Sequence, residues 1–333
     1  MDTSMAFAFL LVSLGGLLTG VFALPMKFIT RWKWENIWLS FSFFGFVLIP
    51  LVVLGSAIPN LREIYGQVLP ARVLLIAVIG YLWGLGAVTY GLSIKRLGIG
   101  LGSAFVLGIS TLLGTLLPIF MASQVSLKWL PFLTGLSMLL GGIAICGLAG
   151  RDRELAAAGS SGEPIQSYAS GLVIGVVSGV LSCLLNVGMV TGAPIQEIAR
   201  RGPAARWAVG NVAWPILLFG GFLANASYCG YLFVRNSSSR LYLESGWRGW
   251  LGSFAMGAAW FIGLLMYGAG AIFMGSLGPI LGWPVFISLM VVSAYLAGRW
   301  TGEWRGVPSS ITRRMNTAIA LIVVSLFIIG YSR

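Results

Sequence analysis

The chain has 333 residues, of which 58% are hydrophobic and only 9% are charged. In a soluble domain roughly a quarter of the residues are charged, and no soluble fold of this size could cover so much apolar surface. We therefore predict an all-α membrane protein that crosses the bilayer many times. The net charge of +12 does not indicate nucleic-acid binding, because the 21 Lys and Arg lie almost entirely between apolar runs, which is typical of orientation in a bilayer.

The residue types present exclude several kinds of catalytic site. The chain contains no histidine, which removes Ser-His catalysis and histidine–metal sites. The three cysteines, Cys146, Cys183 and Cys229, lie inside apolar runs without the spacing of metal ligands. We expect no metal, no other cofactor and no enzyme activity. A membrane-embedded transferase is the alternative from another class, but it needs paired carboxylates, a metal site or histidine, and the sequence has no such cluster.

Ten apolar runs are long enough, at about 20 residues each, to cross a hydrocarbon core of roughly 30 Å. We expect the first to be a retained span rather than a cleaved signal, since no Lys or Arg precedes it. In chain order, the predicted spans are 6–29, 36–56, 71–94, 99–121, 130–149, 170–191, 207–233, 249–272, 277–298 and 312–331.

The longest polar connection divides the chain into two halves of five spans. We predict a first five-helix repeat over 1–150, a linker over 151–168 and a second five-helix repeat over 169–333. The tripeptide Thr19-Gly20-Val21 in the first span matches Ser178-Gly179-Val180 in the sixth. Each half crosses the membrane an odd number of times, so the second half starts on the side opposite to the first and the two related halves point in opposite directions. This is the inverted-repeat architecture of many secondary transporters.

The distribution of basic residues predicts the orientation in the membrane. Connections after the odd-numbered spans hold 14 of the 21 Lys and Arg, and the opposite side holds 7. The richer side is expected in the cytoplasm, so both termini should face outward.

Neutral polar and aromatic residues inside the spans are the candidate ligand-binding groups. In "GVVSGVLSCLLNVGMV" (175–190), Ser178, Ser182 and Asn186 are four residues apart, so they share one face of a helix. Further candidates are aromatic pairs seven residues apart and polar residues in other spans: Trp83 with Tyr90, Trp260 with Tyr267, Ser103, Ser110, Asn211 and Asn225. Such groups suit an uncharged, polyhydroxylated ligand, whose hydroxyls need donors and acceptors and whose C–H face stacks on aromatic rings. The alternative is helix packing, in which Ser and Asn bond across spans or back to the i−4 carbonyl.

Charged residues are candidates for coupling or gating only near the ends of spans. None of the nine acidic residues falls in the middle of a span, so the usual mark of a proton or cation relay is missing. Glu35 and Glu197 lie closest to span ends, and an interfacial charge is the alternative role for each. Lys27 ends the first span, where it either points into a cavity or extends to the lipid headgroups.

The stretch "WGLGAVTYGLSIKRLGIGLGSAFVLGISTLLGTLLPI" (83–119) resembles the L-rhamnose–proton symporter family of the drug/metabolite transporter superfamily. That family has Trp-Gly-x-Gly, then Tyr-Gly-Leu, then Leu-Gly with repeated glycines, then Gly-Ile and Gly-Thr-Leu. The matching residues are Trp83, Gly84, Gly86, Tyr90, Gly91, Leu92, Leu97, Gly98, Gly108, Ile109, Gly114, Thr115 and Leu116. The block "LPMKFITRWKWENIW" is similar to the family's Pro-x-Lys and Trp-x-Trp-Glu pattern at Pro25, Lys27, Trp32, Trp34, Glu35 and Trp38. Weaker similarities cover Ser182, Asn186, Pro194, Glu197, Asn225, Trp260, Tyr267 and Trp283.

This resemblance implies ten spans in two inverted halves, in a bacterial inner membrane, and uptake of a 6-deoxy sugar together with a proton. The expected partners are a neutral monosaccharide and the lipid bilayer. Trp83, Tyr90, Trp260, Tyr267 and Trp283 would form stacking walls, and Ser110, Ser178, Ser182, Asn186 and Asn225 would bond hydroxyls.

The chain departs from the family pattern in two places. The family has a carboxylate early in the ninth span, where this chain reads "MGSLGPILGWPVF", and an amide in the eighth span, where Gly263 stands. The alternatives of an uncoupled facilitator and of a carrier for another small polar metabolite therefore stay open.

Overall fold

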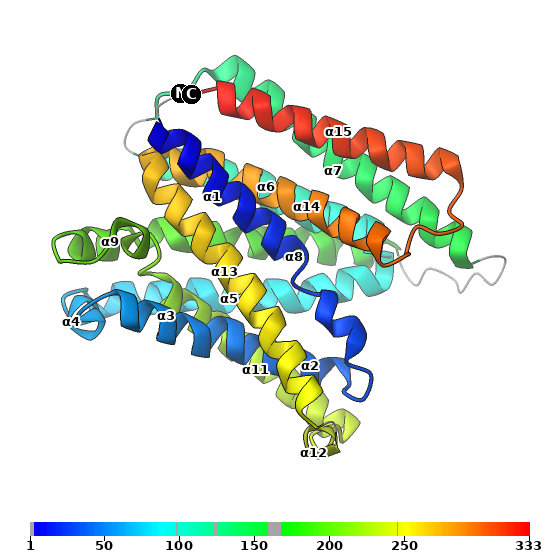
Figure 1. Cartoon of the computed structure of the whole chain (residues 1–333), viewed down its shortest axis with the longest axis horizontal. Helices are drawn as coiled ribbons and strands as arrows, with labels where there is room; N and C mark the ends of the chain where they lie inside the picture. Colours follow the sequence, from blue (N-terminus) through cyan, green and yellow to red (C-terminus); the bar gives the residue numbers. More distant parts are fainter. Residues whose placement is uncertain (1–2, 98, 123–124, 159–167, 245) are drawn as a thin grey trace.

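The computed structural model describes residues 3–97, 99–122, 125–158, 168–244 and 246–333, and all regular structure in these ranges is helical (Figure 1). The elements in chain order are α1 (Thr3–Gly20), η1 (Leu24–Phe28), α2 (Trp34–Phe43), η2 (Phe44–Leu48), α3 (Ile49–Ala57), α4 (Leu61–Gly66), α5 (Pro70–Leu97), α6 (Ile99–Met121), α7 (Trp129–Ala158), α8 (Tyr168–Thr191), α9 (Ala193–Arg200), α10 (Arg206–Val209), α11 (Trp214–Asn236), α12 (Leu241–Glu244), α13 (Trp247–Met274), η3 (Gly275–Leu277), η4 (Gly278–Gly282), α14 (Trp283–Trp300) and α15 (Ser309–Tyr331). Elements η1 and η3 are 3₁₀ turns, and η2 and η4 are π-helical turns.

Nine segments of the described chain are long and apolar enough to cross a membrane, which confirms a multi-pass helical membrane protein. One of them, Trp247–Trp300, is 54 residues long and contains both α13 and α14. The sequence predicted separate spans at 249–272 and 277–298 in this segment. Helix α7 continues to Ala158, so the first part of the predicted linker is helical, while 159–167 lie outside the described residues.

The helix ends define two ends of the bundle. Helix α1 begins and α15 ends on the same side as α4 and α9, at the left of Figure 1, and we call this the terminal end. The opposite end carries the loop between α14 and α15, and Lys27 of η1 contacts Thr301 and Glu303 of that loop, so we call it the Lys27 end.

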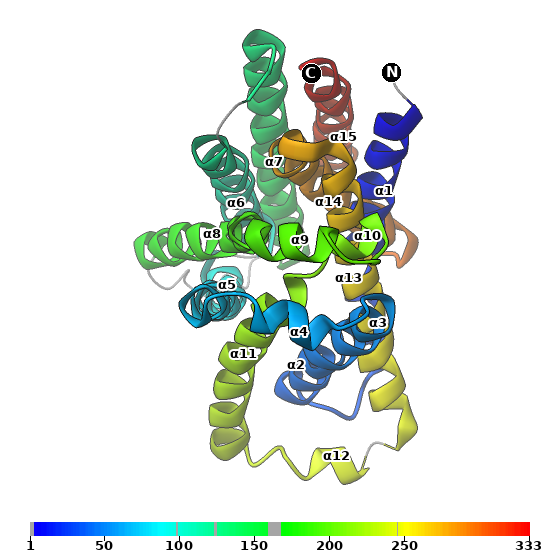
Figure 2. The ribbon, with the colours of Figure 1, turned by 90° about the vertical axis from the view of Figure 1, so that its left-hand side faces the viewer.

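The central helices pack in two matching sets. Helix α1 lies along α13 and α14, and α8 lies along α5 and α6. Helices α7 and α15 pair along one side, and α2 and α11 lie on the other, as the view from the terminal end shows (Figure 2). Small residues permit the close approach of α5 and α11: a Cβ added to Gly80 would lie 1.8 Å from the Leu217 carbonyl oxygen.

Prolines interrupt the hydrogen bonds of three helical segments. Pro50 follows the π-helical turn η2, Pro118 lies inside α6, and Pro284 follows the π-helical turn η4. Proline has no N–H, so each leaves a carbonyl of the preceding turn without its usual helical donor. In a membrane such carbonyls need partners from neighbouring helices. Two of the three affected segments, α6 and η4, meet at the candidate site.

Candidate functional site

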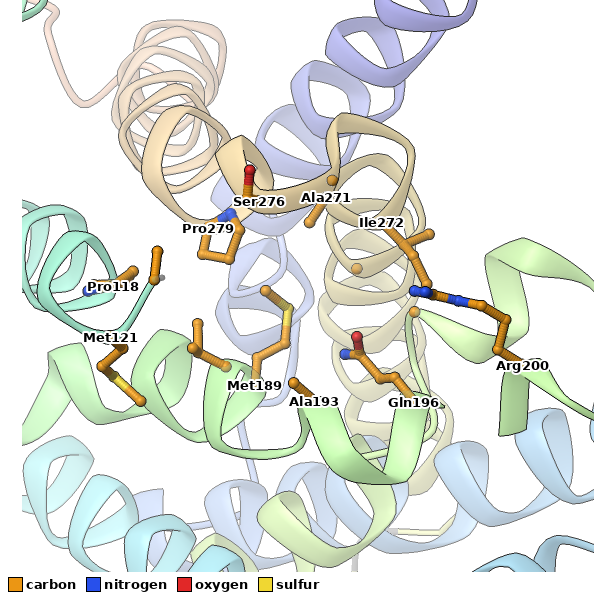
Figure 3. Close-up of a pocket in the computed structure, with 15 residues that line it drawn as sticks. Pro118, Met121, Met189, Ala193, Gln196, Arg200, Ala271, Ile272, Ser276 and Pro279 are labelled. Atoms are coloured by element: carbon orange, nitrogen blue, oxygen red, sulfur yellow. The ribbon is translucent and has the colours of Figure 1, made fainter. Parts of the chain in front are cut away.

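A cavity of about 440 Å³ lies at the terminal end, between the ends of α6, α8 and α13 and the short helix α9. Figure 3 shows the side chains of Gln196 and Arg200 on one side of it and Met189 extending towards Pro279. Gln196, Arg200 and Ser276 supply the polar side chains of the lining, and the other lining residues are apolar or glycine. Most of the lining residues are therefore apolar, and three polar side chains offer hydrogen-bonding groups to a ligand.

Asn186 lies directly beneath this cavity and is fully buried. Its Nδ2 donates to the carbonyl oxygens of Gly114 at 2.7 Å and of Pro279 at 3.0 Å, and its Oδ1 accepts a 2.5 Å hydrogen bond from the Tyr267 hydroxyl. Pro279 also lines the cavity, so one hydrogen bond separates Asn186 from it. We call the Asn186 side chain, the Tyr267 hydroxyl and these two carbonyls the Asn186 set.

The prolines explain why the Asn186 set forms. In α6 the helical donor for the Gly114 carbonyl would be residue 118, which is proline. In a π-helical turn the donor for the Pro279 carbonyl would be residue 284, which is also proline. Asn186 thus satisfies two carbonyls that their own helices leave free, and it joins α8 to α6, η4 and α13. These groups are neutral, and all of them can also bond a hydroxyl.

Trp283 forms one wall beside the Asn186 set. Its ring lies edge-on to Tyr267 with centroids 5.7 Å apart, and its Nε1 donates to the Ser110 carbonyl at 3.1 Å. The absence of a side chain at Gly114 makes room for the indole, since a Cβ there would lie 2.3 Å from Nε1. Ser110 is buried and contributes its backbone carbonyl to this contact.

Trp83 and Trp260 stack on each other, with centroids 5.7 Å apart and an interplanar angle of 26°. Phe46 packs against both rings. Asn225 lies in the adjoining α11, where it accepts a 3.0 Å hydrogen bond from Trp38 Nε1 and donates to the Gly221 carbonyl. Trp83 of α5 and Trp260 of α13 therefore meet, and Asn225 joins α11 to α2.

The three polar residues of α8 have different surroundings. Asn186 belongs to the set beneath the cavity, whereas Ser178 is buried and donates a 2.9 Å hydrogen bond to the Gly86 carbonyl of α5. Ser182 is partly buried. Tyr90, further along α5, pairs with Ser103 of α6 at 2.8 Å. In this conformation Ser178 and Tyr90 form helix contacts and do not line the cavity.

Thr19 of α1 is a polar residue that the sequence analysis used only for the repeat. It is buried, and its hydroxyl has no hydrogen-bond partner within the described ranges. Gly263 of α13 lies against it, because an added Cβ would be 2.1 Å from Thr19 Oγ1. A larger side chain at position 263 would therefore collide with Thr19 and with the Gly15 carbonyl of α1.

The three predicted coupling or gating residues differ in their contacts. Lys27 forms an ion pair with Glu303 and donates to Thr301 Oγ1 at 2.8 Å. Glu35 is buried and accepts hydrogen bonds from Asn236 Nδ2 at 2.9 Å and Ser238 Oγ at 2.5 Å, which fastens the loop after α11 to α2. Glu197 is exposed and pairs with Arg200 of its own helix at 3.2 Å.

Glu303 is a functional candidate that the sequence did not predict. Burial raises the pKa of its carboxyl, but the hydrogen bond and charge of Lys27 and the charge of Arg153 outweigh burial, so the pKa lies below its ordinary value. Sequence offers one signal for this site: Glu303 is the only acid in the connection after α14. The described residues contain no cluster of acids or cysteines that could hold a metal ion.

A multi-pass helical bundle whose cavity ends on a buried set of neutral hydrogen-bonding groups has the organisation of a membrane transporter. Comparison with known families specifies this class. The chain belongs to the L-rhamnose-proton symport protein family, whose model matches residues 1–332. This is a family of transporters rather than enzymes, and the match confirms the resemblance found in the sequence.

Curated relatives agree with the family assignment. The chain is 24% identical over 335 residues to the L-rhamnose-proton symporter of Pectobacterium atrosepticum, and the alignment covers 95% of each chain. It is 25% identical over 323 residues to the proteins of the same name in Yersinia pestis and Yersinia pseudotuberculosis, with 93% of this chain and 92% of the relative covered.

Proposed function

We propose that this protein takes up L-rhamnose, or a closely related neutral 6-deoxy sugar, together with a proton. The observation that carries the proposal is the Asn186 set beneath the cavity, in a chain that belongs to the L-rhamnose-proton symport family. A sugar that leaves water must exchange each hydration hydrogen bond for one to the protein. The Asn186 set offers donors and acceptors without a net charge, which suits an uncharged solute.

The sugar would reach the Asn186 set through the cavity at the terminal end. There the Asn186 amide and the Tyr267 hydroxyl would exchange their present partners for sugar hydroxyls, and the Gly114 and Pro279 carbonyls would accept from them. Trp283 would pack against the C–H face and the methyl group of the sugar. Trp83 and Trp260 form further stacking surfaces of the same path, with Asn225, Ser110, Ser178, Ser182 and Tyr90 as hydroxyl-bonding groups that open as the helices move.

We infer ten crossings from the length of the segment that holds α13 and α14. At 1.5 Å per residue, 54 residues extend about 80 Å, more than twice the thickness of the hydrocarbon core. Helix α1 begins and α15 ends at the same end of the bundle, which an even number of crossings requires.

Inverted repeats are supported by pairs of equivalent contacts. If α1 corresponds to α8 and α5 to α13, Thr19 corresponds to Ser178 and Gly86 to Gly263. Thr19 lies against Gly263, and Ser178 bonds Gly86, so exchanging the halves exchanges these two contacts. The packing of α1 on α13 and α14 matches that of α8 on α5 and α6 in the same way.

The aromatic stack supports the same relation. Trp83 and Trp260 occupy equivalent positions, three residues before Gly86 and Gly263, and they stack on each other. Two equivalent residues meet when a two-fold axis passes between them. Rocking of one repeat against the other about such an axis is the usual basis of alternating access.

We propose a bacterial inner membrane as the location, with both termini outside, on the basis of the Lys and Arg distribution. The cavity at the terminal end then opens outward, and the Lys27 end faces the cytoplasm. Lys27, Glu35 and Glu197 remain the proposed coupling or gating residues. Lys27 is favoured for gating because its ion pair joins the two halves.

Uptake into proteoliposomes tests the proposed function. Purified protein is reconstituted, and labelled L-rhamnose is added with and without an inward proton gradient. We expect accumulation above equilibrium that requires the gradient and that a protonophore abolishes. Uptake that ignores the gradient would identify a facilitator, and the absence of any saturable sugar uptake would refute the substrate.

A further inference from the structure

Two cations, Lys27 of η1 and Arg153 near the end of α7, hold one carboxylate of the second half at the Lys27 end. Lys27 contacts Oε1 of Glu303, and Arg153 of α7 forms a 3.4 Å ion pair with Oε2. Lys27 also donates to Thr301 of the same loop. Glu303 therefore ties η1 and the end of α7 to the loop that follows α14.

The loop is shaped and anchored for these contacts. Gly302 has φ of +84°, a left-handed conformation that residues with side chains rarely adopt, and it immediately precedes Glu303. The next residue, Trp304, packs edge-on against Tyr295 with centroids 5.1 Å apart. The Arg153 guanidinium also lies 5.1 Å from the Trp304 ring. The position of Glu303 is thus defined by backbone conformation and by aromatic packing as well as by charge.

The two ends of the bundle differ in this respect. At the terminal end, the ion pair found among the described residues joins Glu197 to Arg200 within α9, beside the open cavity. At the Lys27 end, the pairs of Glu303 join η1 and α7 to the loop after α14, and Arg314 of α15 pairs with Asp152 of α7. The terminal end therefore has the larger cavity, of about 440 Å³, whereas the cavity at the Lys27 end is about 250 Å³ and is lined in part by Arg153 and Glu303, whose charged contacts span it.

We propose that Glu303 is a gating residue of the transport cycle: its contacts with Lys27 and Arg153 keep the Lys27 end closed while the terminal end is open, and they break whenever access passes to the other side. This inference rests on the proposed function in one respect, that access to the site alternates between the two ends. Contacts made in only one of two conformations shift the equilibrium towards that conformation. Glu303 acts by positioning the helix ends and does not contact the sugar.

A cysteine at the cavity measures which end is open, without any sugar. Ser276 lines the cavity and is exposed, whereas the three native cysteines are buried, so Ser276→Cys is the reactive thiol. In purified protein carrying Ser276→Cys, adding Glu303→Gln is expected to slow labelling by a thiol reagent about threefold or more, because the protein spends less time open at the terminal end. The matched control is Glu154→Gln, since Glu154 accepts a hydrogen bond from the Gly100 N–H of α6 and an amide oxygen preserves that contact.

Cross-linking tests the same point through transport. In a Lys27→Cys/Glu303→Cys variant, a short, cleavable bifunctional thiol reagent is expected to stop uptake, and cleavage of the linker to restore it. Unchanged labelling in Glu303→Gln, together with normal uptake in the cross-linked protein, would overturn the proposal. If Glu303→Gln does not fold, Lys27→Gln removes the same pair from the other side. The labelling shift is measurable even if L-rhamnose is not the substrate, so failure of the gate and failure of the proposed function are distinguishable.

Discussion

Replacing Asn186 by alanine tests the physical origin of the Asn186 set. The change leaves the Gly114 and Pro279 carbonyls and the Tyr267 hydroxyl without their partner in the protein interior. Hydrogen bonds between membrane helices average about 0.6 kcal/mol, so three of them amount to about 2 kcal/mol of stability. We expect a loss of that size in thermal or denaturant unfolding of the purified protein.

A second substitution, at Pro118, should restore part of the lost stability. Pro118→Ala supplies an N–H that can bond the Gly114 carbonyl within α6. In the Asn186→Ala background Pro118→Ala should raise the free energy of unfolding by about 0.5–1 kcal/mol. In the wild type, where Asn186 already bonds the Gly114 carbonyl, the same change should bring no gain. Strictly additive effects of the two substitutions would refute the assignment of Asn186 as the partner of a carbonyl that proline leaves free.

Three further outcomes are expected. Trp260→Phe removes the indole that stacks on Trp83, and it should weaken sugar binding about 2- to 10-fold in a calorimetric titration, with folding preserved; unchanged affinity would place the stack outside the path. Because pairing lowers the pKa of Glu303, its charge stabilises the fold above the ordinary carboxyl pKa. The difference in melting temperature between wild type and Glu303→Gln should therefore be constant from about pH 6 to 8 and shrink as the pH falls below about 4. A difference that grows on acidification would contradict the pairing. Uptake should also fall when Lys27→Gln removes the ion pair, by about 3-fold or more at equal expression; unaffected uptake would exclude a gating role for Lys27.

The sequence was sufficient to predict the class of fold because apolar runs of about 20 residues have few other stable solutions. It also identified the family, since the glycine and tryptophan pattern around Trp83 is specific. Hydropathy was less informative where helices break. The short elements η3 and η4 join α13 to α14 within one continuous apolar segment, where glycines and the prolines at positions 279 and 284 mark the change but hydropathy does not.

The candidate site shows where sequence periodicity stops being informative. Ser178 and Asn186 share a face of α8, yet one contacts α5 and the other contacts α6 and η4. A helical repeat predicts which residues share a face but not which neighbour each of them meets. Likewise, the contact between Lys27 and Glu303 joins residues 276 positions apart, and no local pattern predicts such a pair.

The most direct test of the account is equilibrium binding of L-rhamnose to the purified protein and to two asparagine variants. Asn316→Ala is the matched control, since Asn316 accepts a 2.6 Å hydrogen bond from the Tyr295 hydroxyl between α14 and α15, away from the cavity. We predict that Asn186→Ala raises the Kd about 5- to 150-fold, as expected for two lost hydrogen bonds, and that Asn316→Ala leaves the Kd unchanged. Equal affinity in the wild type and in folded Asn186→Ala would contradict the central claim that a neutral sugar binds at the Asn186 set.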